Sequence, residues 1–252
     1  MQAKKIVAGV DLGPAADNHS MGVLLATKNN ASWSVESIVP TENYDDPNAP
    51  YIDILKSCNV IVIDAPLWLE SEDRCRSWES HLIDLANHRV EFDNWKPSQT
   101  HALYSHAWRA KDLLRGLRNA NTSHRIYEIF PAAWFALTYR HDQPANWKGN
   151  KAAIKQKRIW GTEFHTFLQK VGVAIDPINI EKLKTDELDA LPCIFSAILI
   201  LERIDQLICR ASYHGAETEI VFPARISWNN EIQNSWTGEE FDEFIGTIRG
   251  YV

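Results

Sequence analysis

The chain has 252 residues, of which 45% are apolar and 23% are charged, and its formal net charge is −7. This composition excludes a disordered chain, a collagen-like repeat and a small disulfide-stapled scaffold. We expect one domain over residues 1–252 with a helical insertion, because α/β domains often reach this length. The longest apolar stretch, residues 190–201, is shorter than the roughly 20 residues that a transmembrane helix needs. With no signal-peptide pattern at the N-terminus, we expect a cytoplasmic protein that has no membrane partner.

The first part of the chain predicts three short strands, a helix and a fourth strand. Residues 6–11, 21–28 and 32–39 are rich in β-branched residues or alternate in polarity, and turn-forming residues separate them. Three such strands in succession predict an antiparallel meander. Apolar residues recur at helical spacing between residues 46 and 58. Residues 60–64 form an apolar run that ends in aspartate, which is typical of a strand buried on both faces.

The rest of the chain predicts helices on both sides of a returning strand. We expect a helical insertion at about residues 67–124, and strand character returns at residues 125–130. A basic helix follows at residues 151–171, then a very apolar helix at residues 186–209 and a last short strand at residues 219–222. This order predicts an α/β fold in which helices cover a mixed sheet.

Five acidic residues stand where this organisation would let them converge. Asp11 ends the first strand and Asp64 ends the strand at residues 60–64. If these two strands are parallel neighbours, both carboxylates emerge at the sheet edge where open α/β sheets bind ligands. Glu128 lies in the returning strand, and Asp186 and Asp189 share one helical face. Each acid alone is also compatible with a turn or a helix cap, but crowded carboxylates favour a divalent cation that offsets their repulsion.

Five short segments follow one another along the chain: GVDL (residues 9–12), IDAPL (63–67), IYEIFPA (126–132), DELDAL (186–191) and EIVFP (219–223). In this order they resemble the family of predicted RNase H-like nucleases, which are related in fold to RuvC-type resolvases. The resemblance implies a five-stranded mixed sheet, three antiparallel strands and then parallel strands, flanked by helices. It also implies a site for Mg²⁺ or Mn²⁺ that is built from Asp11, from Asp64 or Glu128, and from the pair Asp186 and Asp189.

Pro192 leaves open which acid of that pair binds the metal. It follows Asp189 by three residues, and a proline inside a helix removes a hydrogen bond. We therefore expect a helix that begins near Asp189 or one with an irregular first turn.

The function that we expect is that of a metal-dependent nuclease, which hydrolyses the phosphodiester bonds of DNA or RNA. In this hypothesis Asp11 and Asp189 hold the metal, while Asp64, Glu128 and Asp186 complete the shell. Metal ions in such sites activate a water molecule for in-line attack on phosphorus.

The charge distribution suggests how nucleic acid could bind. Residues 101–160 contain eleven Lys and Arg and three acids, so this stretch carries +8 and the rest of the chain carries −15. Two explanations fit this pattern equally well: the charges lie on solvent-exposed helix faces, or they form a basic surface that binds a polyanion. On such a basic surface we place Arg109, Lys148 and Lys151 near phosphate. The alternative function is a non-catalytic binding module that uses this basic stretch or the tryptophans of the insertion, which are Trp68, Trp78, Trp95 and Trp108.

Overall fold

The computed structural model describes residues 4–12, 21–38, 50–65, 110, 113–117, 125–138, 151–204, 208–212 and 219–223. The described strands are β1 (Ile6–Leu12), β2 (Met21–Asn29), β3 (Ser32–Ile38), β4 (Val60–Asp64), β5 (Arg125–Ile129), β6 (Ile208–Ser212) and β7 (Glu219–Pro223). The described helices are α1 (Pro50–Lys56), α4 (Pro131–Thr138), α5 (Lys151–Lys170) and α6 (Thr185–Glu202), with a short 3-10 turn, η2, at Ile180–Lys182.

The strands form one mixed sheet in the order β3-β2-β1-β4-β5-β7-β6. Strands β1, β2 and β3 pair antiparallel, whereas β1, β4, β5 and β7 run parallel. The predicted meander and the α/β class are therefore confirmed, and so is the mixed arrangement of the first five strands. Strand β7 lies where a last strand was expected, and β6 pairs antiparallel with it at the sheet edge. The sheet thus has seven strands, two more than the resemblance implies.

Two expectations about the apolar helix are wrong. The helix α6 ends at Glu202 because Arg203 adopts a left-handed conformation (φ 58°, ψ 42°), and residues 208–212 form β6 instead of continuing the helix. At its other end α6 begins at Thr185, before Asp189, and continues through Pro192. The buried packing of this helix outweighs the single hydrogen bond that the proline removes, because every residue from Ala190 to Ile200 is buried.

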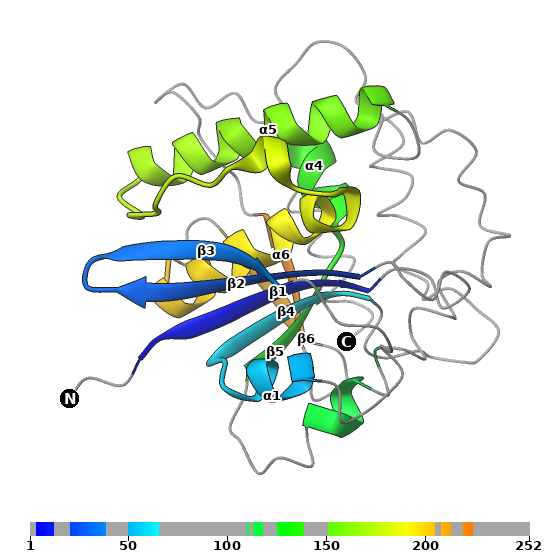
Figure 1. Cartoon of the computed structure of the whole chain (residues 1–252), viewed down its shortest axis with the longest axis vertical. Coiled ribbons are helices and arrows are strands. Elements are labelled where there is room, and N and C mark those ends of the chain that lie inside the picture. The colour runs from blue at the N-terminus through cyan, green and yellow to red at the C-terminus, as the bar shows by residue number, and fades with distance from the viewer. Residues whose placement is uncertain are drawn as a thin grey trace, which may run out of the picture.

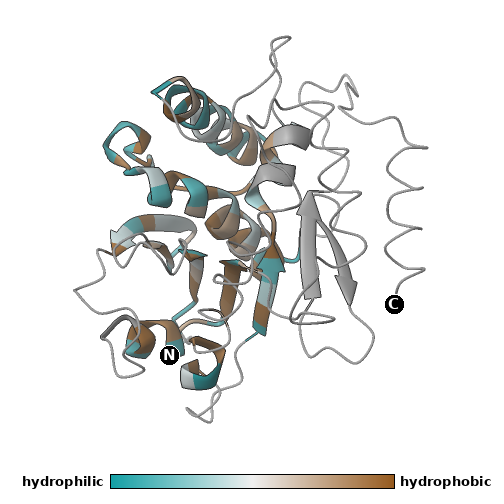
Figure 2. Cartoon of the chain, turned by 90° about the vertical axis from the view of Figure 1, so that its right-hand side faces the viewer, coloured by the Kyte–Doolittle hydropathy of each residue, from teal (hydrophilic) through white to brown (hydrophobic). Residues whose placement is uncertain are grey.

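Helices cover both faces of the sheet (Figure 1). The helices α4, α5 and α6 lie on one face, with α6 next to the strands, and α1 lies on the other. In Figure 2 the central strands are mostly hydrophobic, whereas α5 mixes hydrophilic and hydrophobic residues. Along β4, Val60 and Val62 belong to the core under α6, while Ile61 and Ile63 belong to the core under α1. This alternation shows which face each strand residue of the candidate site points to.

The described part of the expected insertion is helical. Residues 110 and 113–117 are in helical conformation, and Ala110, Leu113 and Leu117 pack in the core under α1. The tryptophans of the insertion, Trp68, Trp78, Trp95 and Trp108, lie outside the described residues. Within the ranges that the structure covers, no helix combines the length and the apolar character needed to cross a membrane.

Candidate functional site

Asp11 and Asp64 lie side by side at the ends of two parallel strands. Asp11 of β1 is the register partner of Asp64 of β4, which confirms that these strands are parallel neighbours. Neighbouring strands are about 4.8 Å apart, so the two residues start from adjacent backbone positions. Both follow the alternation of Val60 and Val62 and therefore point to the face covered by α6.

Gly22 brings the first turn of α6 close to these two aspartates. On its other side β1 pairs with β2, where Gly22 is the register partner of Asp11. A Cβ atom on Gly22 would lie 2.1 Å from the carbonyl oxygen of Asp186, which no side chain tolerates. A Cβ on Gly9 would lie 2.3 Å from the backbone nitrogen of Ile194, so α6 also approaches β1 closely further along. The two glycines let α6 dock on the sheet with Asp186 and Asp189 near Asp11.

Glu187, between the two aspartates of α6, fastens the start of the helix. Its side chain accepts a hydrogen bond from the backbone N–H of Lys184 at 2.7 Å and another from the hydroxyl of Ser37 on β3. The residue is buried, with 8% of its surface exposed. Glu187 therefore ties the first turn of α6 to the sheet. Sequence reasoning missed it.

The four aspartates form one electrostatic unit around Asp11. The pKa of Asp11 is raised well above its usual value, first by burial and then by the negative charges of Asp64, Asp189 and Asp186. Beneath them, burial raises the pKa of the Cys193 thiol, and the charges of Asp64, Asp11 and Asp189 add to this effect. These shifts show that negative charge accumulates at this edge of the sheet. The site therefore favours a positively charged ligand.

Lys157 of α5 is the residue of this site that sequence reasoning did not place. Its Nζ atom lies 2.5 Å from Oδ1 of Asp189, and only 4% of the lysine side chain is exposed. Its positive charge lowers the pKa of Asp11, although burial and the neighbouring carboxylates together raise this pKa. A signal was present in the sequence, because Lys157 stands in the buried stripe of α5 between Ala153 and Trp160. A charged residue at a core position commonly has a buried partner.

Glu128 faces away from the aspartates, although the nuclease hypothesis placed it in the shell around the metal. Glu128 of β5 is the register partner of Ile63, which belongs to the core under α1. Because partners in parallel strands point to the same face, Glu128 points away from the face that carries Asp11 and Asp64. The prediction placed Glu128 in the right strand, and of the two acids that the resemblance offered, Asp64 is the one that the structure puts next to Asp11.

The cations expected near phosphate are only partly within the described chain. Arg109 and Lys148 lie outside the described residues, whereas Lys151 is exposed at the start of α5. Lys155 is exposed one turn later. In contrast, Arg158 lies 3.5 Å from Glu181 and donates to the carbonyl oxygen of Leu183 at 3.4 Å. The part of the basic stretch that lies in α5 thus offers two exposed lysines, whereas its other two cations, Lys157 and Arg158, are paired with acidic residues of the protein.

The donor atoms of the cluster suit a hard divalent ion. They are carboxylate oxygens, the ligands that Mg²⁺ prefers and Mn²⁺ accepts. Asp11 is buried while Asp64, Asp186 and Asp189 are partly exposed, so the cluster opens toward solvent. Among the described residues, no three His, Cys, Asp or Glu side chains are already gathered closely enough to hold a metal ion.

The chain was compared with models of protein families, with curated proteins and with solved structures, and none of them matches. The geometry of the site and the chemistry of its residues therefore carry the functional argument.

Proposed function

We propose that this protein is a divalent-metal-dependent phosphodiesterase of RNase H-like fold that acts on nucleic acid. One observation carries the proposal: Asp11 and Asp64 stand in register on parallel strands, and Gly22 lets α6 add two more aspartates to them. Carboxylates crowded at the carboxyl ends of parallel strands repel one another, and a divalent cation is the ligand that best offsets this repulsion.

The residues that would bind the ion come from the sheet and from α6. Asp11 and Asp64 would hold Mg²⁺ or Mn²⁺ from the sheet, and Asp186 and Asp189 would close over it from the helix. Such an ion, when bound, polarises a phosphoryl oxygen and lowers the pKa of a water molecule. Asp11 is buried and would hold the ion from the protein interior, whereas Asp64 is partly exposed and would leave an approach for the substrate. Lys151 and Lys155, both exposed on α5, would contact phosphates beyond the cleaved bond.

Conversion of one carboxylate to an amide tests the proposal. With Mg²⁺ or Mn²⁺ present, we expect the wild type to cleave DNA, RNA or a branched substrate, and Asp64→Asn to lose at least about a hundredfold in rate because the amide binds the ion weakly. Asp53→Asn is the matched control, since Asp53 lies on α1 with 77% of its side chain exposed. Cleavage by Asp64→Asn at the wild-type rate would contradict the proposal.

Thermal unfolding gives a second measurement that does not depend on knowing the substrate. Millimolar Mn²⁺ should raise the melting temperature of the wild type and of Asp53→Asn, because an ion that binds the native state stabilises it by mass action. The rise should be much smaller for Asp64→Asn. Equal shifts in all three proteins would show that the ion does not bind at Asp64.

The same preparations decide between the nuclease and a non-catalytic binding module. Lys151 and Lys155 are exposed, so a double charge reversal to Glu should weaken nucleic-acid binding and reduce its salt dependence. Binding that depends on these lysines, without cleavage in Mg²⁺ or Mn²⁺, would favour the module. If neither binding nor cleavage is observed at low salt, both nucleic-acid functions are rejected.

A further inference from the structure

A buried cation lies inside the cluster of aspartates. The Nζ atom of Lys157 is 2.5 Å from Oδ1 of Asp189, and the lysine side chain is 4% exposed. Removing an ammonium group from water is costly unless a partner compensates for it. Lys157 therefore differs from the lysine of a surface ion pair, whose ammonium group can be solvated by water in place of its partner.

Core packing fixes the place of this lysine. The ring of Trp160, one turn further along α5, stacks on Phe164 with the ring centroids 5.2 Å apart. Phe164 in turn stacks on Phe195 of α6 with centroids 5.5 Å apart. These contacts hold α5 against α6 independently of any charge. The helix that carries Lys157 is therefore packed against the helix that carries Asp189 by contacts that do not involve this ion pair.

The geometry places this ammonium group where a second metal ion would lie. Mg²⁺ binds carboxylate oxygen at about 2.1 Å, so an ion on Oδ1 of Asp189 would lie at most about 4.6 Å from Nζ of Lys157. In two-metal sites the ions are roughly 3.5–4 Å apart. The distance from the lysine Nζ to an ion on Asp189 would thus be similar to the distance between the two ions of a two-metal site. The positive charge of the lysine would repel a second cation at that position.

We propose that Lys157 takes the place of a second divalent ion, so that the site binds a single Mg²⁺ or Mn²⁺ between the sheet and α6. This inference rests on the proposed function, because it describes how the same site is charged. Lys157 supplies the other positive charge, which faces the phosphate from the side of Asp189. Since the lysine is part of the chain, its charge is present at any metal concentration. It neutralises part of the negative charge of the cluster before the ion binds.

Counting bound Mn²⁺ tests the inference without an activity assay. A titration followed by electron paramagnetic resonance of free Mn²⁺ should give one ion in the wild type. Lys157→Ala removes the charge and leaves space, so we expect it to bind two ions. Lys157→Gln, a neutral variant that preserves more of the packing, should also accept a second ion. Lys157→Arg keeps the charge and should bind one.

Lys155→Ala is the matched control, because Lys155 lies on the exposed side of the same helix and its removal should leave the count at one. Two ions in the wild type would overturn the inference and leave the proposed function intact. A single ion in both neutral variants would overturn it as well, since the lysine would then not set the count. No bound ion in the wild type would reject the proposed function together with the inference.

Discussion

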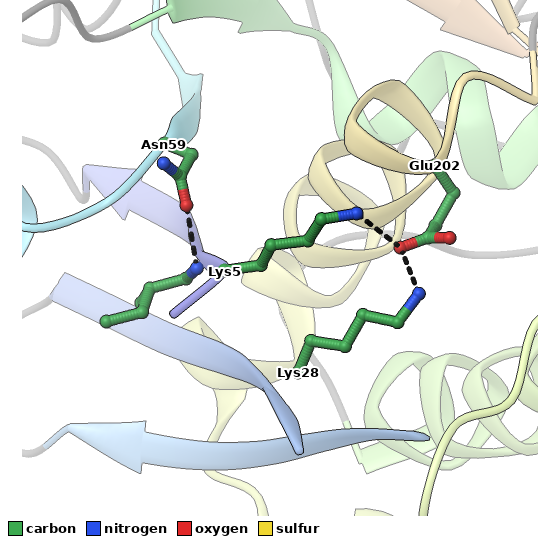
Figure 3. A network of polar contacts seen from close by, with 5 residues as sticks. Lys5, Lys28, Asn59 and Glu202 are labelled. Carbon is green, nitrogen blue, oxygen red and sulfur yellow. Dashed lines mark hydrogen bonds and ion pairs between the residues drawn. The ribbon is translucent and has the colours of Figure 1, made fainter. Parts of the chain in front are cut away.

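The two ends of α6 meet the sheet through opposite arrangements of charge. At its C-terminal end, Glu202 lies between two lysines: Lys28 donates to its Oε1 at 2.6 Å, and Nζ of Lys5 lies 4.0 Å from the same oxygen (Figure 3). At its N-terminal end the proportion is reversed, because Lys157 stands among four aspartates. One end is a carboxylate next to two cations, and the other, within the described part of the chain, is a group of four aspartates around one lysine.

This difference separates a structural contact from a candidate site on the same helix. The contact at Glu202 joins α6 to β2, and nearby Asn59 accepts a hydrogen bond from the N–H of Ile6 at 2.9 Å, which aligns the starts of β1 and β4 (Figure 3). Such a balanced arrangement contributes stability and needs no ligand. The aspartate end has a raised pKa at Asp11, so its ionised form opposes folding until a cation binds. The candidate site is thus distinguished by an excess of negative charge among the described residues, and not by the number of its ion pairs.

The largest effect is expected where the backbone of α6 touches the sheet at the aspartate end. Gly22→Ala places a Cβ 2.1 Å from the carbonyl oxygen of Asp186, so the helix must shift, and overpacking of this kind costs about 3 kcal/mol. The stabilisation by Mn²⁺ should fall as well, because Asp186 and Asp189 move away from Asp11. Denaturant unfolding with and without Mn²⁺ measures both effects.

Gly172→Ala is the control for the loss of a glycine. Gly172 has a φ of 91°, and no atom lies within 4 Å of the point that a Cβ would occupy. The substitution therefore costs backbone strain of about 1 kcal/mol and should leave the response to Mn²⁺ unchanged. If Gly22→Ala behaves like Gly172→Ala, the close approach of α6 is not what positions the aspartates.

A smaller effect, which depends on pH, is expected from Asp11→Asn in a chelating buffer. The folded pKa of Asp11 is raised, so above its ordinary value of 3.8 the native state holds a proton that the unfolded state releases. Stability is therefore lost as the pH rises through this window, by up to about 1.4 kcal/mol per pH unit for one group. Asparagine cannot ionise, so Asp11→Asn should be more stable than the wild type at neutral pH.

The advantage of Asp11→Asn should shrink as the pH falls toward 3.8, where the aspartic acid is itself protonated. Urea unfolding at several pH values measures this trend. A variant that is less stable than the wild type at neutral pH without metal would contradict the electrostatic description of the aspartate end.

The smallest effects belong to the balanced end. Lys28→Met removes the closer ion pair with Glu202 and a cation contact 5.7 Å above the ring of Trp33, which together are worth about 1 kcal/mol. Lys5→Met should change stability by less than about 0.5 kcal/mol, because its ion pair is long and its side chain is half exposed. Neither variant should alter Mn²⁺ binding. A clear change in metal affinity in either one would remove the contrast between the two ends.

Local sequence patterns predicted the framework of the site well. The strands around Asp11 and Asp64 are marked by short β-branched runs that end in aspartate. That β1 and β4 are parallel neighbours was only a condition of the prediction, and the structure supplies both the pairing and the register. The expectation that Glu128 belongs to the site was wrong because the face to which a strand residue points depends on register, and a shift of one residue reverses that face. Register between β4 and β5 is set across a long insertion, beyond what local periodicity shows.

Other features depend on contacts that are distant in sequence. A glycine inside a strand signals close backbone approach, but only the fold shows that α6 is the element that approaches Gly22. Lys157 interrupts an apolar helical stripe, yet its partner Asp189 lies on a different helix. The predicted helix ran on to residue 209, into the start of β6, and the strand itself was not predicted because its stability comes from pairing with β7, which its own composition does not reveal.

The most direct test of the central claim, that the aspartate end of α6 binds a divalent ion, is a crystal of the wild-type protein soaked in Mn²⁺. The anomalous scattering of manganese should give a peak bound by carboxylate oxygens of Asp11, Asp64 and at least one of Asp186 and Asp189. No peak among these residues, with Mn²⁺ found at other acidic positions of the same crystal, would contradict the claim.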